Sequence, residues 1–225
     1  MKIIILGAPG SGKGTQAAYL TRRLEVPKIS TGDMLRAVIS ANTILGKKVK
    51  AILASGELVS DDIILALVKE RLAAADCERG FLFDGFPRTI VQAEGLWQAG
   101  IDVDCIIDIN VPDQEIIKRL SGRLVHLSSG RIYHTEFNPP KIAGLDDETG
   151  ESLVQREDDK KEVVVQRLKV YHEQTEPLAA WYQSENYFGA AKYIQISGLK
   201  QVNEIAEDIL NCISEFFTVT KKQIH

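Results

Sequence analysis

A glycine-rich loop near the start of the chain constrains the fold more than any other feature. The preceding run Lys2–Leu6 is apolar and rich in isoleucine, which predicts a strand buried on both faces. Gly7–Thr15 then reads GAPGSGKGT, and Lys13–Leu24 has the pattern of a helix. Glycines here let successive backbone N–H groups turn toward a polyphosphate, and the helix start adds its positive dipole end. The sequence therefore predicts a phosphate-binding loop between a strand and a helix.

Lys13 carries the most direct chemistry of this loop. Its ammonium group can reach the β- and γ-phosphates of a nucleoside triphosphate. Such loops commonly place Ser or Thr next, where the hydroxyl binds Mg²⁺, but here Gly14 comes next and Thr15 follows. We therefore expect Mg²⁺ to be held mainly by nucleotide phosphates and water, with no dedicated protein metal site. The alternative is a plain turn with a surface lysine, which the flanking strand and helix disfavour.

Strands and helices alternate along most of the chain. Three further apolar runs read as buried strands, at Phe81–Phe83, Cys105–Ile109 and Tyr193–Ile196, and a last helix is predicted over Val202–Phe217. Alternation of this kind indicates a parallel sheet covered on both faces. The predicted fold class is α/β, a three-layer P-loop NTPase fold with a central parallel sheet.

Capping and proline signals place several helix ends. Ser60 precedes an acidic first turn, so a helix is predicted to begin there. Pro112 suits the first turn of another helix, where its missing N–H costs little. Asp159 and Glu162 have the spacing of a capping box. Pro177 falls inside the helical pattern that follows, so we expect a kink or an early end there.

Two segments interrupt the alternation. Residues 30–59 look helical and amphipathic, whereas residues 122–159 are rich in glycine, proline, serine and aspartate. The second segment is too long for a simple loop and predicts a small β-rich lobe. The polar tail at residues 218–225 is predicted to be frayed. The predicted core domain comprises residues 1–29, 60–121 and 160–217.

Composition narrows the classes of function. A chain of 225 residues can bury one core with inserted lobes. Its formal net charge of −4 argues against nucleic acid or an anionic membrane as a partner. No apolar run is long enough to cross a bilayer, and we expect no signal peptide. The three cysteines, Cys77, Cys105 and Cys212, form no paired motif, which favours reduced thiols in a cytoplasmic protein.

Asp84 follows the strand predicted at Phe81–Phe83. Open parallel sheets bind ligands at the carboxyl edge of the strands, so this carboxylate should face the phosphate loop. It would hold a water molecule on Mg²⁺. An N-cap or a loop acid is the alternative interpretation.

Further motifs follow in order along the chain. They are STGDMLR at residues 30–36, DGFPRT at 84–89 with Gln92 after it, Gly122–Arg123, FNPP at 137–140, and Arg156 with Arg167. With GAPGSGKGT before them, the chain resembles the adenylate kinases from Lys2 to about Phe216. The likeness is to the long-lid bacterial type whose lid holds no zinc. It implies reversible transfer of a phosphoryl group from ATP to AMP, giving two ADP, by a monomer.

The resemblance also implies roles for segments and residues. Residues 30–59 would form the AMP-binding lobe, and residues 122–159 a lid that closes over both nucleotides and excludes water. ATP would contact Gly10, Ser11, Gly12, Lys13, Gly14, Thr15, Arg119, Arg123, Ile132, Tyr133 and Lys200. AMP would contact Thr31, Arg36, Glu57, Leu58, Val59, Gly85, Phe86, Pro87, Arg88, Gln92, Arg156 and Arg167. The catalytic group would be Lys13, Asp84, Arg88, Arg123, Arg156 and Arg167.

Electrostatics agrees with this division of roles. Phosphoryl transfer depends on positioning and charge stabilisation, and two nucleotides bring several negative charges together. Arginine suits this task because its planar fork binds phosphate through two hydrogen bonds and keeps its charge. Each arginine alone could be a surface ion pair, but five around one phosphate loop favour the functional reading. A general base is not needed, because the second pKa of a phosphate ester is about 6.

Acceptor specificity rests on two residues. In the family resembled, Thr31 goes with AMP, whereas related pyrimidine nucleotide kinases tend to carry alanine there. Gln92 would read the adenine edge by paired hydrogen bonds, and the alternative is a solvent-exposed helix residue. Rival functions are a UMP or CMP kinase, a P-loop switch that binds GTP, and an inactive nucleotide-binding protein. No N-K-x-D guanine motif is present, which disfavours the switch.

The lid of some relatives holds structural zinc with two cysteine pairs. The matching positions here are His126, Ser129, Asp146 and Thr149, which keep the spacing of the pairs but lack thiolates. Hydroxyl groups are poor ligands for a closed zinc site. We therefore predict a hydrogen-bonded polar cluster and no structural zinc, against the alternative of four unrelated polar loop residues.

Overall fold

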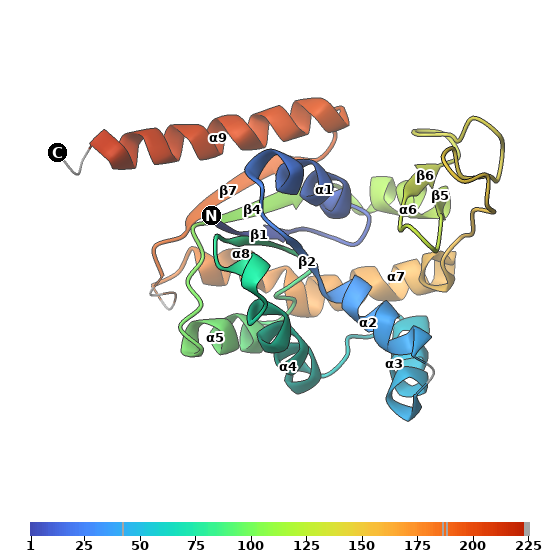
Figure 1. The fold of residues 1–225 in the computed structure, drawn as a ribbon, viewed down its shortest axis with the longest axis horizontal. Coiled ribbons are helices and arrows are strands. Elements are labelled where there is room, and N and C mark those ends of the chain that lie inside the picture. Colours follow the sequence, from blue (N-terminus) through green and yellow to red (C-terminus); the bar gives the residue numbers. More distant parts are fainter. Residues whose placement is uncertain (42, 186, 188, 223–225) are drawn as a thin grey trace.

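The computed structural model describes residues 1–41, 43–185, 187 and 189–222, with side chains through Glu215. At its centre lies a five-stranded parallel sheet in the order β2-β3-β1-β4-β7 (Figure 1). The strands are β1 (Lys2–Leu6), β2 (Lys28–Ser30), β3 (Phe81–Asp84), β4 (Cys105–Asn110) and β7 (Lys192–Ser197). Helices cover both faces of the sheet, so the predicted three-layer α/β architecture is confirmed.

Helices connect the strands and pack on the sheet. They are α1 (Lys13–Leu24), α2 (Thr31–Ser40), α3 (Ile44–Ala54), α4 (Asp61–Leu72), α5 (Ile90–Gln98), α6 (Asp113–Ser121), α7 (Lys161–Val170), α8 (Pro177–Tyr182) and α9 (Val202–Lys222). Side-chain caps begin three of them: Ser30 accepts from the N–H of Asp33, and Thr43 and Thr89 act alike on α3 and α5. Each cap satisfies a backbone donor that the first helical turn leaves without a partner.

Alternate residues of β1 point into two separate hydrophobic clusters. Ile3 and Ile5 belong to the cluster that α1, α6, α7 and α9 cover. Ile4 and Leu6 belong to the cluster on the other face, which helices α2 to α5 and α8 cover. A strand buried on both faces must be apolar at every position, which is why this run shows no alternation of polar and apolar residues.

Several element boundaries correct the sequence-based predictions. The edge strand β2 was not predicted, because three residues beginning with an exposed lysine show no period; it forms by pairing with β3. The proposed capping box is wrong, because Lys160 is the N-cap of α7 and Asp159 ends a short 3₁₀ turn. The frayed tail is wrong for residues 218–222, which continue α9. No glycine or proline follows Phe217 to end that helix, and residues 223–225 lie outside the described residues.

The expected interruption near Pro177 is confirmed. Helix α7 ends at Val170 and is followed by a π-helical turn, Tyr171–Thr175, in which the N–H of Glu176 donates to the oxygen of Tyr171 at 2.8 Å. Helix α8 then begins at Pro177. A proline cannot donate to the preceding helical turn, so the α-helical ladder cannot continue through this point.

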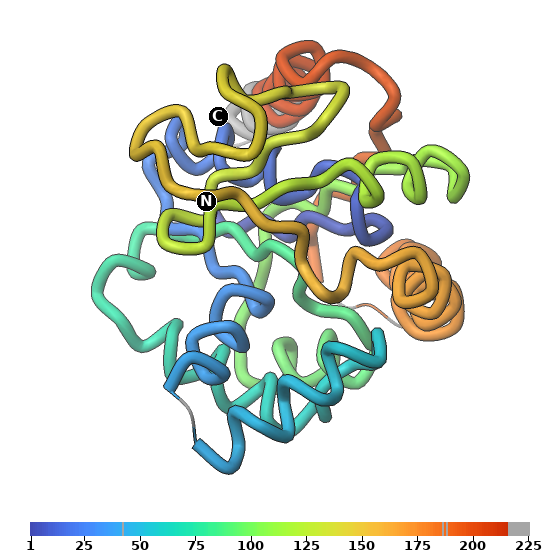
Figure 2. The backbone as a smooth tube through the Cα atoms, turned by 90° about the vertical axis from the view of Figure 1, so that its right-hand side faces the viewer, coloured from blue at the N-terminus to red at the C-terminus, as the bar shows by residue number. Residues whose placement is uncertain are grey.

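Two insertions stand at the same side of the sheet as the glycine-rich loop (Figures 1 and 2). One contains α2 and α3. The other contains β5 (Arg123–Val125) and β6 (Ile132–His134), an antiparallel pair extended by isolated bridges such as Val125 with Val154. Figure 2 shows the second insertion above the first. Within the described part of the chain, no helix combines the length and hydrophobicity that crossing a bilayer requires.

Candidate active site

The backbone of the glycine-rich loop follows a path that favours glycine, and Gly10 and Gly12 show this at the start of α1. Gly12, the N-cap of α1, has φ of +100°, and Gly10 has φ of +84°. At Gly10 a Cβ atom would also lie 2.8 Å from the side chain of Leu120. Both residues therefore occupy the left-handed region that favours glycine. This path carries the loop around the first turn of α1, whose N–H groups have no helical partner.

Lys13 lies over this loop. Its Nζ donates to the carbonyl oxygens of Gly7 at 2.7 Å and Ala8 at 2.6 Å. Burial lowers the pKa of Lys13 from 10.5 to about 7, an effect that the charge of Asp84 opposes. Three of the predicted arginines lower this pKa further through their charges, namely Arg88, Arg167 and Arg123. The structure thus gathers predicted catalytic residues from three other stretches of the chain around one lysine.

Asp84 ends β3 beside this loop, as predicted. It is paired in register with Ile5 of β1 on one side and Ser30 of β2 on the other. The Nζ of Lys28 lies 4.0 Å from its Oδ2. A Cβ atom at Gly14 would lie 3.4 Å from the same oxygen, so a side chain after Lys13 would be in direct contact with the carboxylate.

The residues near the loop fit Mg²⁺ that arrives with nucleotide phosphates. Asp84 offers a carboxylate oxygen, the hard ligand that Mg²⁺ prefers, and Thr15 is exposed. Among the described residues, no group of three or more His, Cys, Asp or Glu side chains could hold a metal ion. The donor set beside the loop is therefore that of a partial site, which phosphate oxygens and water would complete.

Two predicted arginines share one buried carboxylate. Arg123 binds Asp159 through paired hydrogen bonds, with Nε donating to Oδ2 at 2.7 Å. Arg167 donates to the backbone oxygen of Asp158 at 2.8 Å and lies 3.2 Å from Asp159 Oδ1. The Asp159 side chain is fully buried. Neither aspartate is predicted as a site residue, although the run of three acids that follows Arg156 was a visible signal.

Arg156 has a buried donor in the same region. Its Nε atom is buried without a hydrogen-bond partner among the described atoms. Burial lowers the pKa of Arg156 from 12.5 to about 10, and the charges of Arg36 and Arg123 act in the same direction. Arginines from both insertions therefore lie within electrostatic reach of one another. An anion bound between them would satisfy the free donor and reduce their mutual repulsion.

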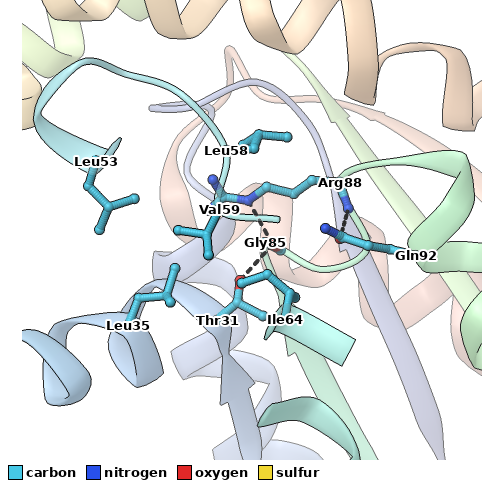
Figure 3. A pocket seen from close by; sticks show the side chains of 9 residues that line it. All are labelled: Thr31, Leu35, Leu53, Leu58, Val59, Ile64, Gly85, Arg88 and Gln92. Atoms are coloured by element: carbon cyan, nitrogen blue, oxygen red, sulfur yellow. Dashed lines mark hydrogen bonds between the residues drawn. The ribbon is translucent and has the colours of Figure 1, made fainter. Parts of the chain in front are cut away.

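An open cavity lies between α2, α3 and the end of β3 (Figure 3), with about 280 Å³ of empty space that includes solvent at its mouth. Its lining comprises Thr31, Leu35, Leu53, Leu58, Val59, Ile64, Gly85, Arg88 and Gln92. Six of these residues are among those predicted to bind AMP. The other three, which the sequence did not indicate, are Leu35, Leu53 and Ile64. The missed residues are apolar positions of amphipathic helices, which the sequence cannot distinguish from ordinary core positions. The lining suits a flat apolar ring with a polar edge.

The carbonyl oxygen of Gly85 accepts hydrogen bonds from two side chains that line this cavity. It accepts from Thr31 Oγ1 at 2.9 Å and from Arg88 Nε at 2.8 Å (Figure 3). Thr175 of the π turn donates to the carbonyl oxygen of Arg88 at 2.8 Å. Gln92 is 2% exposed, so the alternative of a solvent-exposed helix residue is wrong.

The other residues predicted to contact AMP lie around this cavity rather than in its lining. Phe86 and Pro87 are buried, and Phe86 packs edge-on against Phe83. Glu57 is exposed and accepts from Gln166 Nε2 at 2.7 Å. Arg36 is paired with Asp33.

Residues predicted to contact ATP lie at the phosphate loop, on the surface near α9 and in the second insertion. Arg119 lies across the phosphate loop, donating to the oxygens of Ser11 at 3.5 Å and Gly198 at 2.9 Å. Lys200 is exposed and pairs with Asp208 of α9 at 2.6 Å. In the second insertion, Ile132 is 40% exposed, whereas the neighbouring tyrosine is buried. The structure therefore brings Arg119 to the loop and leaves Lys200 on the surface.

The four side chains predicted to form a polar cluster lie together in the second insertion. His126 Nδ1 is 2.7 Å from Ser129 Oγ, and Thr149 Oγ1 donates to Asp146 Oδ2 at 2.9 Å. His126 Nε2 and Thr149 Oγ1 join the two pairs at 3.4 Å. Three further side chains, which the spacing of the four did not indicate, join the cluster: Arg131, Tyr133 and Glu151.

Arg131 supplies the positive charge of this cluster. Its Nε donates to Asp146 Oδ1 at 2.8 Å and its Nη2 to Oδ2 at 2.6 Å. The Arg131 hydrogen bonds hold the pKa of the Asp146 carboxyl well below its usual range. The hydroxyl of Tyr133, a predicted ATP contact, donates to the same carboxylate at 3.0 Å, so this side chain faces the interior of the insertion.

Comparison with known families gives one decisive match. A family model described as adenylate kinase matches residues 5–187. The chain belongs to the adenylate kinase family. It is therefore a phosphotransferase enzyme with nucleoside monophosphate kinase activity, and the resemblance to this family is confirmed. Adenylate kinases bind ATP, AMP and ADP and use Mg²⁺ with ATP.

The matched range of this adenylate kinase family member contains most of the geometry above. It includes the phosphate loop, the cavity, Asp84 and all of the predicted arginines. It ends before Gly198, Lys200 and helix α9, whose placement rests on the structure alone.

Proposed function

We propose that this enzyme transfers the γ-phosphoryl group of ATP to AMP, reversibly, giving two molecules of ADP. The observation that carries the proposal is the position of Arg88. This arginine lines a cavity suited to a nucleoside base and also acts electrostatically on Lys13 of the phosphate loop. A monophosphate bound through Arg88 would therefore lie beside the triphosphate on the loop.

The chemistry needs few covalent roles from the protein. An oxygen of the AMP phosphate attacks the γ-phosphorus of ATP, and the bond to the β,γ-bridging oxygen breaks, so that ADP leaves. The attacking oxygen is already anionic at neutral pH, because the second pKa of a phosphate ester is about 6. The active-site cations align the two phosphates in line and neutralise the charge that spreads over the transferring group.

Lys13 and the arginines would share this charge. Burial lowers the pKa of Lys13 to about 7, close to neutral pH. A polyphosphate bound beside it would favour the charged form of the lysine. Arg88 would hold the acceptor phosphate, and Arg123, Arg156 and Arg167 would surround the transferring group. Mg²⁺, bound by the nucleotide phosphates and by water held on Asp84, would supply further charge neutralisation.

We propose that residues 30–59 act as an AMP-binding lobe and residues 122–159 as a lid. The lid carries Arg123 and Arg156 at its two ends, so its closure would bring both onto the phosphates. Closure would also exclude water, which otherwise competes as the phosphoryl acceptor. A double-headed inhibitor made of two adenosines joined by a polyphosphate should reduce the radius of gyration in solution scattering. An unchanged radius would contradict closure.

An acceptor panel tests the reaction itself. The wild-type enzyme is incubated with ATP and Mg²⁺ and with AMP, GMP, CMP or UMP, and the diphosphate formed is measured. AMP is expected to give the highest kcat/KM, and preference for UMP or CMP would overturn the proposal. Lys13→Met should lower kcat/KM by about 100-fold or more. Lys69→Met, which changes an exposed lysine of α4, is the matched control and should retain wild-type activity.

The three cysteines bear on the cellular setting. They are free thiols, and two of them, Cys77 and Cys105, are buried. Burial raises the pKa of the Cys105 thiol to about 12, which disfavours the reactive thiolate. We propose a cytoplasmic monomer that keeps these thiols reduced.

A further inference from the structure

The side-chain amide of Gln92 is held at both ends by hydrogen bonds to other groups of the protein. Its Nε2 donates to Asp61 Oδ1 at 2.8 Å. Its Oε1 accepts from the backbone N–H of Arg88 at 2.7 Å (Figure 3). The residue is 2% exposed, so solvent does not replace these bonds.

The chemistry of the two partners leaves only one orientation for this amide. A carboxylate can only accept a hydrogen bond, and a backbone N–H can only donate one. Turning the Gln92 amide over would place its oxygen against the carboxylate of Asp61 and its NH₂ group against the N–H of Arg88. Both contacts would then be repulsive, and each group would lose a buried partner.

The amide keeps one unused donor and one unused acceptor site. An amide has two N–H donors and two acceptor lone pairs, and Asp61 and Arg88 use one of each. Gln92 also lines the cavity. It can therefore present one N–H and one lone pair there, in an order that its two partners determine.

The order of donor and acceptor matters for specificity, because the purine bases differ in the order of donor and acceptor atoms along the edge that would meet Gln92. Adenine offers a donor at N6 and an acceptor at N1, whereas hypoxanthine and guanine offer an acceptor at O6 and a donor at N1. A glutamine that turned over freely could pair with either edge. We propose that Asp61 is a specificity-determining positioning residue, which selects the adenine edge by holding the Gln92 amide in one orientation. This inference rests on the proposed use of AMP as acceptor.

Asp61 is itself well placed for this role. It is the first residue of α4, and its Oδ1 also accepts from Thr89 Oγ1 at 3.0 Å. Thr89 in turn caps α5 by accepting from the backbone N–H of Gln92 at 3.1 Å. The carboxylate thus links the starts of two helices. It does not line the cavity, so it acts on the base only through Gln92.

The test compares AMP with inosine monophosphate as acceptors. Inosine monophosphate carries hypoxanthine, which has the reversed edge and lacks the 2-amino group that could clash for a separate reason. In Asp61→Asn the new side chain can donate as well as accept, so one of the two contacts that oppose the reversed amide is removed and only the N–H of Arg88 still opposes it. The ratio of kcat/KM for AMP to that for inosine monophosphate should fall about ten-fold.

Asp62→Asn is the matched control. Asp62 is also an acid in the first turn of α4, but it is exposed. This variant loses the same charge at the same helix end and should keep the wild-type ratio. Both acceptors are measured on one preparation, so the ratio does not depend on the folded fraction.

The possible outcomes separate the role of Asp61 from the proposed function. A wild-type ratio in Asp61→Asn would overturn the role of Asp61 and leave the proposed function standing. An equal fall in the Asp62→Asn control would assign the effect to helix charge and would also overturn it. A wild-type enzyme that does not phosphorylate AMP would overturn the proposed function, and this inference with it.

Discussion

Arg123 and Asp159 face each other across the base of the second insertion, joined by two parallel hydrogen bonds. The Arg123 Nε to Asp159 Oδ2 distance is 2.7 Å, and the carboxylate is fully buried. Arg167 approaches the same carboxylate at 3.2 Å. Two arginines proposed to meet the transferring phosphoryl group are thus held by one protein carboxylate in this structure.

Replacing the Asp159 carboxylate with an amide should destabilise the protein and make its stability depend more strongly on bound ATP. Asp159→Asn leaves two largely buried guanidinium groups with less opposing charge, so the free energy of unfolding should fall by roughly 3 kcal/mol. ATP phosphates would supply the missing charge. ATP with Mg²⁺ should therefore raise the melting temperature of the variant more than that of the wild type.

Thermal unfolding with and without ATP and Mg²⁺ measures this difference. Glu157→Gln is the control, because Glu157 lies in the same 3₁₀ turn but is exposed and pairs with Lys160. Equal gains from nucleotide in the wild type and in Asp159→Asn would contradict the idea that phosphate and carboxylate compete for the same arginines.

Thr175 should affect the acceptor side of the reaction. Its hydroxyl donates to the carbonyl oxygen of Arg88 at 2.8 Å, from the π turn that precedes Pro177. Thr175→Val keeps the shape but removes this bond. The KM for AMP should rise about five-fold, the equivalent of roughly 1 kcal/mol, with a smaller change in the KM for ATP.

Steady-state kinetics with each substrate varied separately checks this expectation. Thr175→Ser retains the hydroxyl and should restore the KM for AMP. Thr21→Val is the control, because Thr21 makes a bond of the same 2.8 Å length to the Ala17 oxygen within α1. If both KM values rose together in Thr175→Val, the residue would have only a general structural role.

His172 is expected to give a pH-dependent contact between the π turn and α6. Its Nδ1 is 2.8 Å from Glu176 Oε2, and its Nε2 is 2.9 Å from Asp113 Oδ2. Both partners are carboxylates, so only the doubly protonated ring satisfies both contacts. The pKa of His172 is raised above 6.5, first by the hydrogen bond to Glu176 and then by that to Asp113.

The sign of the effect on stability follows from that raised pKa. The contribution of His172 is fully present below about pH 6.5 and is lost as the pH rises through the pKa of the folded state. Its size should be small, because the ring and both carboxylates are substantially exposed. An NMR titration should place the wild-type pKa above 6.5, with Glu176→Gln lowering it. A pKa that does not change in Glu176→Gln would contradict the arrangement.

Much of the fold could be predicted because its signals are local. The run at β1 is apolar at every position because the strand is buried on both faces, and α1 begins and ends where its pattern does. The break at Pro177 follows from the missing N–H of a single residue. The phosphate loop is also local, since its glycines and Lys13 are contiguous. These features depend on neighbours in the chain, which a sequence displays directly.

The sequence by itself determined the fold class, the phosphate loop and the family. Only the tertiary structure decided how the site's polar groups are shared: Asp159 serves Arg123 and Arg167 rather than a helix cap, and Asp61 holds the amide of Gln92. The edge strand β2 likewise exists only through its pairing with β3. The physical reason is that a hydrogen bond or a strand pair between distant residues leaves no periodic trace in either segment, whereas burial, capping and glycine conformation do.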